Sequence, residues 1–383
     1  MEGPRACKKD EIQQVISLTN ETFRNSPGMF KTMHKEFPLL LSEKNLDNMR
    51  VISVDGEIAA DVNYYPTMMD IEGSRIKAAS IGAVCTDDKH RGKGYASIIL
   101  DDIEKRLYKN KTHLLFVSGG RSLYIRRGCT FCGKFYELKI NKEMLNEIPV
   151  LSSMKVEELA DYNAEMFINL YNRDSSRFIR SYEEFNSLYS GATTVWGDFY
   201  YKTYVVKLQD EYIAYFIIRV RKNENNKPYG IMVEYAGDIN GIIKGIKEAA
   251  NLNDLDEVMI RSEYRDAMSS YLLSLNASHK EINQLGTVKI IHFTDFMNSL
   301  SDYFKQRLTS EQFNKLSFYE EGSDKVIRYK EEIILLKSTQ SEKLILGEWE
   351  DIKSNWDISL EFKNVLDKIF PIHIPWVGNL NYQ

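Results

Sequence analysis

A short loop at residues 91–96 combines small residues and cations in a way that suits an anionic ligand. It reads Arg91-Gly92-Lys93-Gly94-Tyr95-Ala96, in which Arg91, Gly94 and Ala96 fit the pattern R-x-x-G-x-G/A. Small residues let the backbone approach a ligand and offer it several N–H groups. A helix is expected to follow, and its positive end would point at the same place. Because Arg91 and Lys93 add mobile positive charge, the expected ligand is a pyrophosphate. If the loop is considered alone, the alternative is a basic surface turn without a ligand.

A tyrosine further along the chain could supply a proton. Tyr124 lies four residues before Gly128, just after the stretch Ser118-Gly119-Gly120-Arg121. A phenol with a pKa of about 10 can donate a proton to a thiolate of similar basicity. The alternative is a core aromatic, because the chain has 23 tyrosines.

The elements expected around these residues form an α/β domain with a mixed sheet. Residues 51–60 predict two strands joined by an Asp-Gly turn. A strand is expected at 78–86, a helix at 95–108, and strands at 114–117 and 134–140. Residues 8–24 predict an amphipathic helix. The loop therefore lies between a strand and a helix, as a phosphate-binding loop would.

Residues 50–140 resemble the GNAT superfamily of acetyltransferases. The resemblance implies that the strand 81–86 splays from its neighbour and binds pantetheine through its backbone, that the loop binds the pyrophosphate of acetyl-CoA, and that Tyr124 protonates the departing thiolate. Arg121 either holds a coenzyme phosphate or is a solvated surface charge. The expected cofactor contacts are Val84, Cys85, Thr86, Arg91, Gly92, Lys93, Gly94, Tyr95, Ala96, Ser118, Gly119 and Arg121.

The whole chain resembles a narrower group, the acetyltransferases of the enhanced-intracellular-survival type. The resemblance rests on the length, on the opening Gly3-Pro4-Arg5, on Phe37-Pro38-Leu39-Leu40, and on the closing Phe370-Pro371 and Leu380-Asn381-Tyr382. It implies tandem GNAT-like mixed sheets flanked by helices, followed by a small sterol-carrier-like α+β domain. The expected domains are a catalytic GNAT domain at 1–150, a degenerate second copy at 151–285 and the sterol-carrier-like domain at 286–383.

The pattern of the second segment supports a repeat. Residues 204–215 predict a strand, an acidic turn and a strand, followed by a strand at 231–235, a helix at 239–250, a strand at 257–260 and a helix at 264–275. Only Ala236-Gly237-Asp238 separates its strand from its helix, and an aspartate there would repel a pyrophosphate. The third segment predicts a strand at 288–293, a helix at 296–308, two strands between 324 and 337, and two terminal helices.

The base that takes the proton of the amine is not evident from the motif. Many GNAT domains have a glutamate on or near the splayed strand, but the strand 80–86 has no carboxylate. In the narrower group and in the N-myristoyltransferases the terminal carboxylate of the chain enters the active site, which would give this role to Gln383. Asp87 and Asp88 are rival carboxylates or solvated loop charges. Cys85 invites a covalent intermediate, but a small buried hydrophobic residue is the better interpretation.

Composition limits the class of protein. Four cysteines in 383 residues form no disulfide framework, and Cys129-x-x-Cys132 has no second pair with which to bind zinc, so no metal is expected. The net charge of −5 argues against nucleic-acid binding. No stretch is apolar enough for a membrane helix and the N-terminus has no signal pattern, so we expect a cytoplasmic protein without membrane contact. The narrower group tends to assemble, which allows a homo-oligomer.

Charge is unevenly distributed along the chain. Residues 1–150 hold 23 Lys and Arg against 20 Asp and Glu, whereas the remainder holds 27 against 35. The acidic half suits a cationic acceptor or simply serves solubility. The expected acceptor pocket is built from the 20–40 region and the second domain, with the aromatic residues Phe23, Phe30, Phe37, Tyr64 and Tyr65 as candidates.

These observations predict an acetyl-CoA-dependent N-acetyltransferase acting on a primary amine of a small molecule, peptide or lysine. Two alternatives stay open. One is a non-catalytic coenzyme A sensor or scaffold, which would not need Tyr124. The other is an acyltransferase that uses a different acyl donor.

Overall fold

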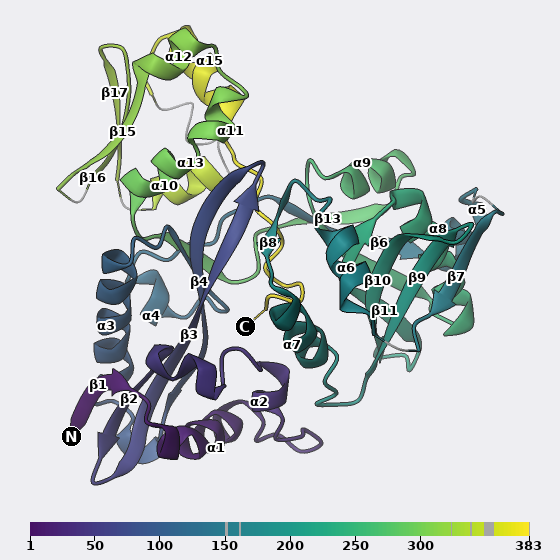
Figure 1. The fold of residues 1–383 in the computed structure, drawn as a ribbon, viewed down its shortest axis with the longest axis horizontal. Helices are drawn as coiled ribbons and strands as arrows, with labels where there is room; N and C mark the ends of the chain where they lie inside the picture. The colour runs from purple at the N-terminus through teal and green to yellow at the C-terminus, as the bar shows by residue number, and fades with distance from the viewer. Residues whose placement is uncertain (150–151, 161, 323, 338, 348–355, 383) are drawn as a thin grey trace.

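The chain folds into two lobes, each built on a seven-stranded sheet, and a smaller α+β part (Figure 1). The computed structural model describes residues 1–149, 152–160, 162–322, 324–337, 339–347 and 356–382. The predicted α/β class with mixed sheets flanked by helices is confirmed.

The first sheet has the strand order β1-β2-β3-β4-β5-β14, and β8 pairs with the far end of β3. Asp55 and Gly56 both have positive φ in the turn between β2 and β3, as a tight hairpin requires. The strands are β1 (Glu2–Ala6), β2 (Met49–Val54), β3 (Glu57–Ile71), β4 (Ser74–Thr86), β5 (Leu114–Val117), β8 (Ser176–Ile179) and β14 (Thr287–Ile290).

Helices cover both faces of this sheet. Helix α3 (Tyr95–Lys109) packs Ile99, Leu100, Ile103 and Leu107 on one face, with α4 (Ser122–Ile125) beside it. Helices α1 (Ile12–Phe23) and α2 (Met33–Glu36) cover the other face. Strand β4 contributes to both cores, and its odd-numbered residues change face along the strand: Ile81 faces α3, whereas Ala83 and Cys85 face α1. A register shift against β3 between Gly82 and Val84 accounts for the change.

The second sheet has the order β13-β6-β12-β11-β10-β9-β7. Its strands are β6 (Phe135–Asn141), β7 (Met154–Glu158), β9 (Tyr200–Leu208), β10 (Glu211–Lys222), β11 (Pro228–Gly237), β12 (Glu257–Glu263) and β13 (Ser278–Ile282). Around it lie α5 (Lys142–Glu147), α6 (Ala164–Tyr171), α7 (Tyr182–Ala192), α8 (Ile239–Leu252) and α9 (Ala267–Ser274).

The two sheets exchange strands. The strand predicted at 134–140 forms as β6, but it pairs antiparallel with β12 of the second sheet. The strand predicted at 288–293 forms as β14 and takes the corresponding place beside β5 of the first sheet. Either segment has the apolar alternation of a strand beside a parallel pair, so pattern alone could not assign the partner. Hydrogen bonds therefore join the predicted domains across the boundaries at 150 and 285, and these boundaries stay a prediction.

The smaller part contains a three-stranded antiparallel sheet of β15 (Leu316–Glu321), β16 (Asp324–Tyr329) and β17 (Glu332–Leu336). The predicted helix at 296–308 is wrong as one element, because the chain turns at Leu300 between two helices. Strands β1, β7, β8, β13 and β15 were not predicted. The helices are α10 (Phe293–Ser299), α11 (Ser301–Lys305), α12 (Ser310–Lys315), α13 (Gln340–Leu346) and α15 (Leu360–Ile369).

The C-terminal tail returns between the two lobes (Figure 1). A buried ion pair anchors it: Arg180 donates to both carboxylate oxygens of Glu234 at 2.9 and 2.7 Å, and its Nε donates to Asn381 at 2.6 Å. The backbone N–H of Leu380 also donates to Glu234, at 3.3 Å. The tail is thus packed against the rest of the chain up to Tyr382, with Ile372, Ile374 and Leu380 buried. Gln383 lies outside the described residues.

Candidate active site

Strands β4 and β5 diverge in the middle of the first sheet. They pair in parallel from Ala78–Leu114 to Ile81–Val117, where β5 ends, but β4 continues to Thr86. In the part of the chain that the structure describes, no strand pairs with the β5 side of residues 82–86. The N–H of Asp87 donates to Ala59 of β3 at 3.0 Å, and Cys85 lies opposite Asp61. By alternation along the strand, the backbone groups of Cys85 therefore face β3, and those of Val84 and Thr86 face the open side and are available to a ligand.

A β-bulge marks the point of divergence. Val62 of β3 lies opposite Val84 and Asn63 lies opposite Gly82, so Ala83 is an extra residue in β4. Its φ of 41° is in the left-handed region, which alanine adopts at a cost. Bulges re-aim backbone groups and are common beside active sites. The sequence contained no signal for this one, because Gly82-Ala83 also fits a regular strand.

The predicted phosphate loop lies at the start of α3. Gly92 and Gly94 have φ of 78° and 77°, a conformation that glycine adopts without strain. Gly94 is the N-cap of α3, and no side chain accepts a hydrogen bond from the first turn of that helix. Its first N–H groups therefore stay open to an anion, and the helix dipole favours one.

Cations surround this helix end. Arg91 is 66% exposed and pairs with Asp88 at 2.6 Å. The Lys93 ammonium lies 3.1 Å from His90, whose ring stacks on Tyr95. Arg121 is exposed at the start of α4. Asp88 thus belongs to an exposed ion pair, and Asp87 accepts a hydrogen bond from the N–H of Lys89, so both aspartates have roles within the loop.

Tyr124 is buried beside the divergence of the strands. It belongs to α4, packs in the core under α3, and its ring lies within van der Waals distance of the position that a side chain on Gly119 would take. Burial raises the pKa of the Tyr124 phenol, and the charge of Arg121 lowers it in part. A raised pKa keeps the phenol protonated, which is the state that a proton donor needs.

A cavity of about 350 Å³ opens on the other side of the divergence. Gly82, Ala83 and Ser118 form its wall on the first sheet, and β9, β10 and β11 of the second lobe form the opposite wall. Of the predicted acceptor aromatics, Phe23 and Phe37 line it. Phe30 is exposed, Tyr64 is buried in the core, and the Tyr65 hydroxyl donates to Glu184. Gly378, Asn379 and Tyr382 bring the C-terminal tail into the cavity.

Cys85 faces helix α1 and not α3. Its thiol is buried and lies 3.8 Å from the Thr19 hydroxyl. Burial raises its pKa, and the nearby Asp61 raises it further, so the thiol is a poor nucleophile. This agrees with its interpretation as a small buried residue.

A polar cluster missed by sequence analysis lies next to Cys85. Asp61 and Asn63 of β3 are fully buried, and the Asn63 amide donates to Asp61 at 2.5 Å. The Oδ1 atom of each has no hydrogen-bond partner among the described residues. Burial raises the pKa of Asp61 well above its usual value, although Asn63 and Cys85 lower it in part. The carboxyl group is therefore held towards its neutral form.

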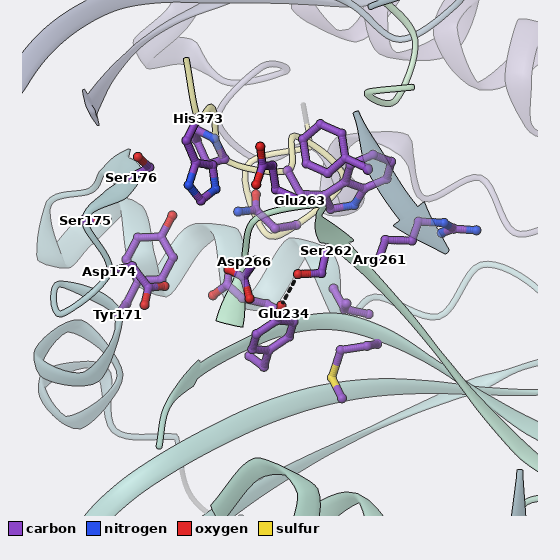
Figure 2. Close-up of a pocket in the computed structure, with 17 residues that line it drawn as sticks. Tyr171, Asp174, Ser175, Ser176, Glu234, Arg261, Ser262, Glu263, Asp266 and His373 are labelled. Atoms are coloured by element: carbon purple, nitrogen blue, oxygen red, sulfur yellow. Dashed lines mark hydrogen bonds between the residues drawn. The ribbon is translucent and has the colours of Figure 1, made fainter. Parts of the chain in front are cut away.

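The second lobe repeats the divergence but surrounds it with acids. Strands β11 and β12 pair only at Gly230–Val258 and Ile231–Met259, and Val233 is the extra residue of a bulge in β11. Figure 2 shows Asp174, Glu234, Glu263 and Asp266 around the pocket of about 160 Å³ that lies there. Helix α8 is capped by its own Asp238, which accepts from the N–H of Gly241 at 2.8 Å. An anionic coenzyme would meet repulsion and a closed helix end.

Residues 4–132 match the family model described as an acetyltransferase (GNAT) domain. The N-terminal part of the chain therefore carries a GNAT domain. The match includes the diverging strands, the phosphate loop and Tyr124. No curated protein matches the chain in sequence.

Solved structures share the fold over almost the whole chain. They include a GCN5-related N-acetyltransferase from Anabaena variabilis, at 15% identity and a TM-score of 0.68, which covers 97% of this chain and 98% of that one. A probable N-acyltransferase from Enterococcus faecalis has 14% identity and a TM-score of 0.66, with 97% and 96% covered. Eis1 from Mycobacterium abscessus has 11% identity and a TM-score of 0.63, with 98% and 97% covered. At these identities the likeness shows the fold alone.

The described residues contain no candidate metal site and no candidate membrane-spanning helix. No group of three or more His, Cys, Asp or Glu side chains in those residues could hold a metal ion. No helix in the same part of the chain is long and apolar enough to cross a bilayer. All four cysteines are buried and none forms a disulfide.

We predict that Asp61→Asn stabilises the protein increasingly as the pH rises. The folded state retains a proton on Asp61 that the unfolded chain releases above about pH 4, so the unfolding free energy of the wild type falls with pH. The asparagine variant does not titrate at this position. Its unfolding free energy, relative to that of the wild type, should therefore increase by up to about 1.4 kcal/mol for each pH unit until the folded-state pKa of Asp61 is reached. Denaturant unfolding from pH 4 to 8 measures it. The exposed Asp210→Asn is the control, and equal pH dependence in both variants would contradict the prediction.

Proposed function

We propose that the protein is an acetyl-CoA-dependent N-acetyltransferase that transfers an acetyl group directly to a primary amine of a small molecule, peptide or lysine. One observation carries the proposal: within the GNAT-like residues, an uncapped helix end with two positive-φ glycines lies beside a strand that diverges from its neighbour. The first feature suits a pyrophosphate and the second a pantetheine chain. Acetyl-CoA, when bound, would supply the thioester.

In this proposal, different residues bind the coenzyme, align the thioester and donate a proton to the leaving group. The N–H groups of 91–96, with Arg91 and Lys93, hold the phosphates, and Ser118, Gly119 and Arg121 contribute from the next loop. The backbone of Val84 and Thr86 aligns the thioester arm with the bulge. The amine arrives through the cavity, where alignment with the carbonyl carbon supplies most of the rate gain. As the carbon–nitrogen bond forms and the carbon–sulfur bond breaks, the Tyr124 phenol gives its proton to the sulfur.

The base that takes the ammonium proton is proposed to be the terminal carboxylate of Gln383. Three residues of the adjoining tail line the cavity, and Arg180 holds Asn381 in place. Asp87 and Asp88 are poorer candidates, because each has a partner within the loop. Asp61 is fully buried and held towards its neutral form, which does not suit a base.

A different acyl donor is the alternative that the comparisons leave open, since one structural neighbour is described only as a probable N-acyltransferase. A coenzyme A sensor without catalysis is the other. The burial of Tyr124 next to the divergence supports an enzyme over a sensor.

The same proposal extends to the domain organisation, location and partners of the chain. It comprises a catalytic domain at 1–150, a degenerate second copy at 151–285 that completes the cavity, and a sterol-carrier-like domain at 286–383. It also comprises a cytoplasmic location, no nucleic-acid or membrane partner, and a homo-oligomer as one allowed state. The acidic pocket at β11 and β12 supports the view that the second copy binds no coenzyme.

Acetyl-CoA should bind the wild-type protein with a micromolar Kd in a calorimetric titration, and the Arg91→Glu, Gly94→Asp variant should not bind it. The new aspartate would place a negative charge at the open end of α3 and would strain a position with positive φ, and a cation would become an anion. A matched control is Arg328→Glu, Gly73→Asp, which repeats the charge change and the positive φ away from the loop, because Gly73 lies at the opposite end of β4. No binding by the wild type would end the acetyltransferase proposal.

Tyr124→Phe should lower kcat by about 10²–10⁴-fold, because the thiolate then leaves without a proton donor. Affinity for acetyl-CoA should change by less than about threefold, since the ring still fills its place in the core. Thiol release with a panel of primary amines measures turnover. Tyr108→Phe, an exposed phenol on α3, is the control. Unchanged kcat in the Tyr124 variant would remove the tyrosine from the mechanism.

Removal of Tyr382 and Gln383 should lower turnover by at least about 100-fold and leave acetyl-CoA affinity intact, because the base would be displaced from the cavity. Gln383→Ala retains the main-chain carboxylate and should keep near-normal turnover. Full activity of the truncated chain would exclude the terminal carboxylate as the base.

A further inference from the structure

The charges that line the acceptor cavity are mainly positive. Among the described residues, Arg24, Arg219 and Arg261 line it, against the single acid Glu36. This is the reverse of what the acidic composition of residues 151–383 suggested for a cationic acceptor. The net charge of the cavity lining depends on which of these arginines already has a carboxylate partner, because an arginine keeps its positive charge at any ordinary pH.

Two of the three arginines are neutralised within the protein. Arg24 donates two hydrogen bonds to Glu36 and stacks over Trp196 at 4.3 Å. Arg261 donates to Glu137 at 2.7 and 2.9 Å. Each pair therefore contributes little net charge to the cavity.

Arg219 has no such partner. None of the ion pairs among the described residues includes it, and its buried Nε has no hydrogen-bond partner there. Its guanidinium lies over the Phe199 ring at 5.5 Å and next to the Tyr201 phenol, whose pKa burial raises and Arg219 lowers. In the sheet Arg219 is directly opposite Tyr201 on one side and Ile231 on the other, and both of those residues line the cavity. Among the described residues, the cavity thus contains one partly buried cation without a carboxylate partner.

A desolvated guanidinium is stabilised most by a planar anion that accepts two hydrogen bonds. In the acidic pocket next to the cavity, burial raises the pKa of Asp174 to about 7, and the other three acids already have partners within the chain, so little charge is left to attract a cation. Glu234 pairs with Arg180 and Glu263 with Arg265, and Asp266 caps α9 by accepting from the N–H of Met268. The volume of about 350 Å³ lies within the ~300–1,000 Å³ of small-molecule sites.

We propose that Arg219 binds a carboxylate of the acceptor, so that the substrate class is amines that also carry a carboxylate, such as amino acids or short peptides. The inference rests on the proposed function, since it assumes that the amine enters this cavity. The bulge at Ala83 receives the amine end, and β10 of the other lobe binds the anionic end.

The binding of acetylated products tests the role of Arg219 without any need for catalytic turnover. In the presence of coenzyme A, N-acetyl ω-amino acids with two to six methylene groups are titrated against N-alkylacetamides of the same length. At least one amino acid product should bind the wild type at least about tenfold tighter than its neutral counterpart, and Arg219→Met should abolish that difference. Arg219→Lys should retain most of it. Arg221→Met is the control, because Arg221 follows on the same face of β10, contacts the same Phe199 ring and is exposed.

Two results would overturn the proposal. Equal binding of charged and neutral products by the wild type would mean that a group of the chain itself already neutralises Arg219. A charge preference that survives in Arg219→Met, with thermal unfolding showing an intact fold, would assign it to another residue. If charged products bind as expected but no amine is acetylated, the proposed function fails while the anion site stands.

Discussion

The buried ion pair between Arg180 and Glu234 joins the three parts of the chain that surround the acceptor cavity. Arg180 directly precedes α7, whose last residues line the cavity, and Glu234 follows the lining residues Met232 and Val233. Asn381 accepts from Arg180 next to the lining residue Tyr382. Side-chain exposure is only 2% and 3% for the two charges, so loss of either partner would leave an uncompensated charge at a typical cost of about 3–5 kcal/mol.

The pair is tolerated because its remaining hydrogen-bonding capacity is used. The Tyr215 hydroxyl and the Leu380 N–H both donate to Glu234, and the Arg180 guanidinium stacks on Tyr171 at 4.0 Å. Fully satisfied networks of this kind select one arrangement of their elements. Here they determine where the tail enters the space between the lobes.

Strand exchange gives the cavity its second constraint. Strand β14 follows the second lobe in the chain but belongs to the first sheet, and β6 follows the first lobe but belongs to the second sheet, so the chain crosses between the lobes more than once. The bulges at Ala83 and Val233 both line the resulting cavity, one from each sheet. The two divergences differ in charge and helix capping: the one in the first lobe has an open helix end and cations, whereas the one in the second has Asp238 as a cap and acids around its pocket. The chain thus has one divergence suited to an anionic coenzyme.

Local features were accessible from the sequence by itself. The Asp55-Gly56 turn, the strand at 114–117, helix α3 and the glycine loop before it depend on residues close in the chain, and they formed where periodicity and turn chemistry predicted them. The order of strands, the partner exchange of β6 and β14, the bulge at Ala83 and the isolated charge of Arg219 were not accessible. Each depends on which distant segments meet: an edge strand can pair with either sheet, a bulge depends on register against a neighbour, and a counter-charge is known only when all groups around it are placed. The sequence determined the residues that could hold an anionic coenzyme, but only the tertiary structure decided what faces them across the cavity.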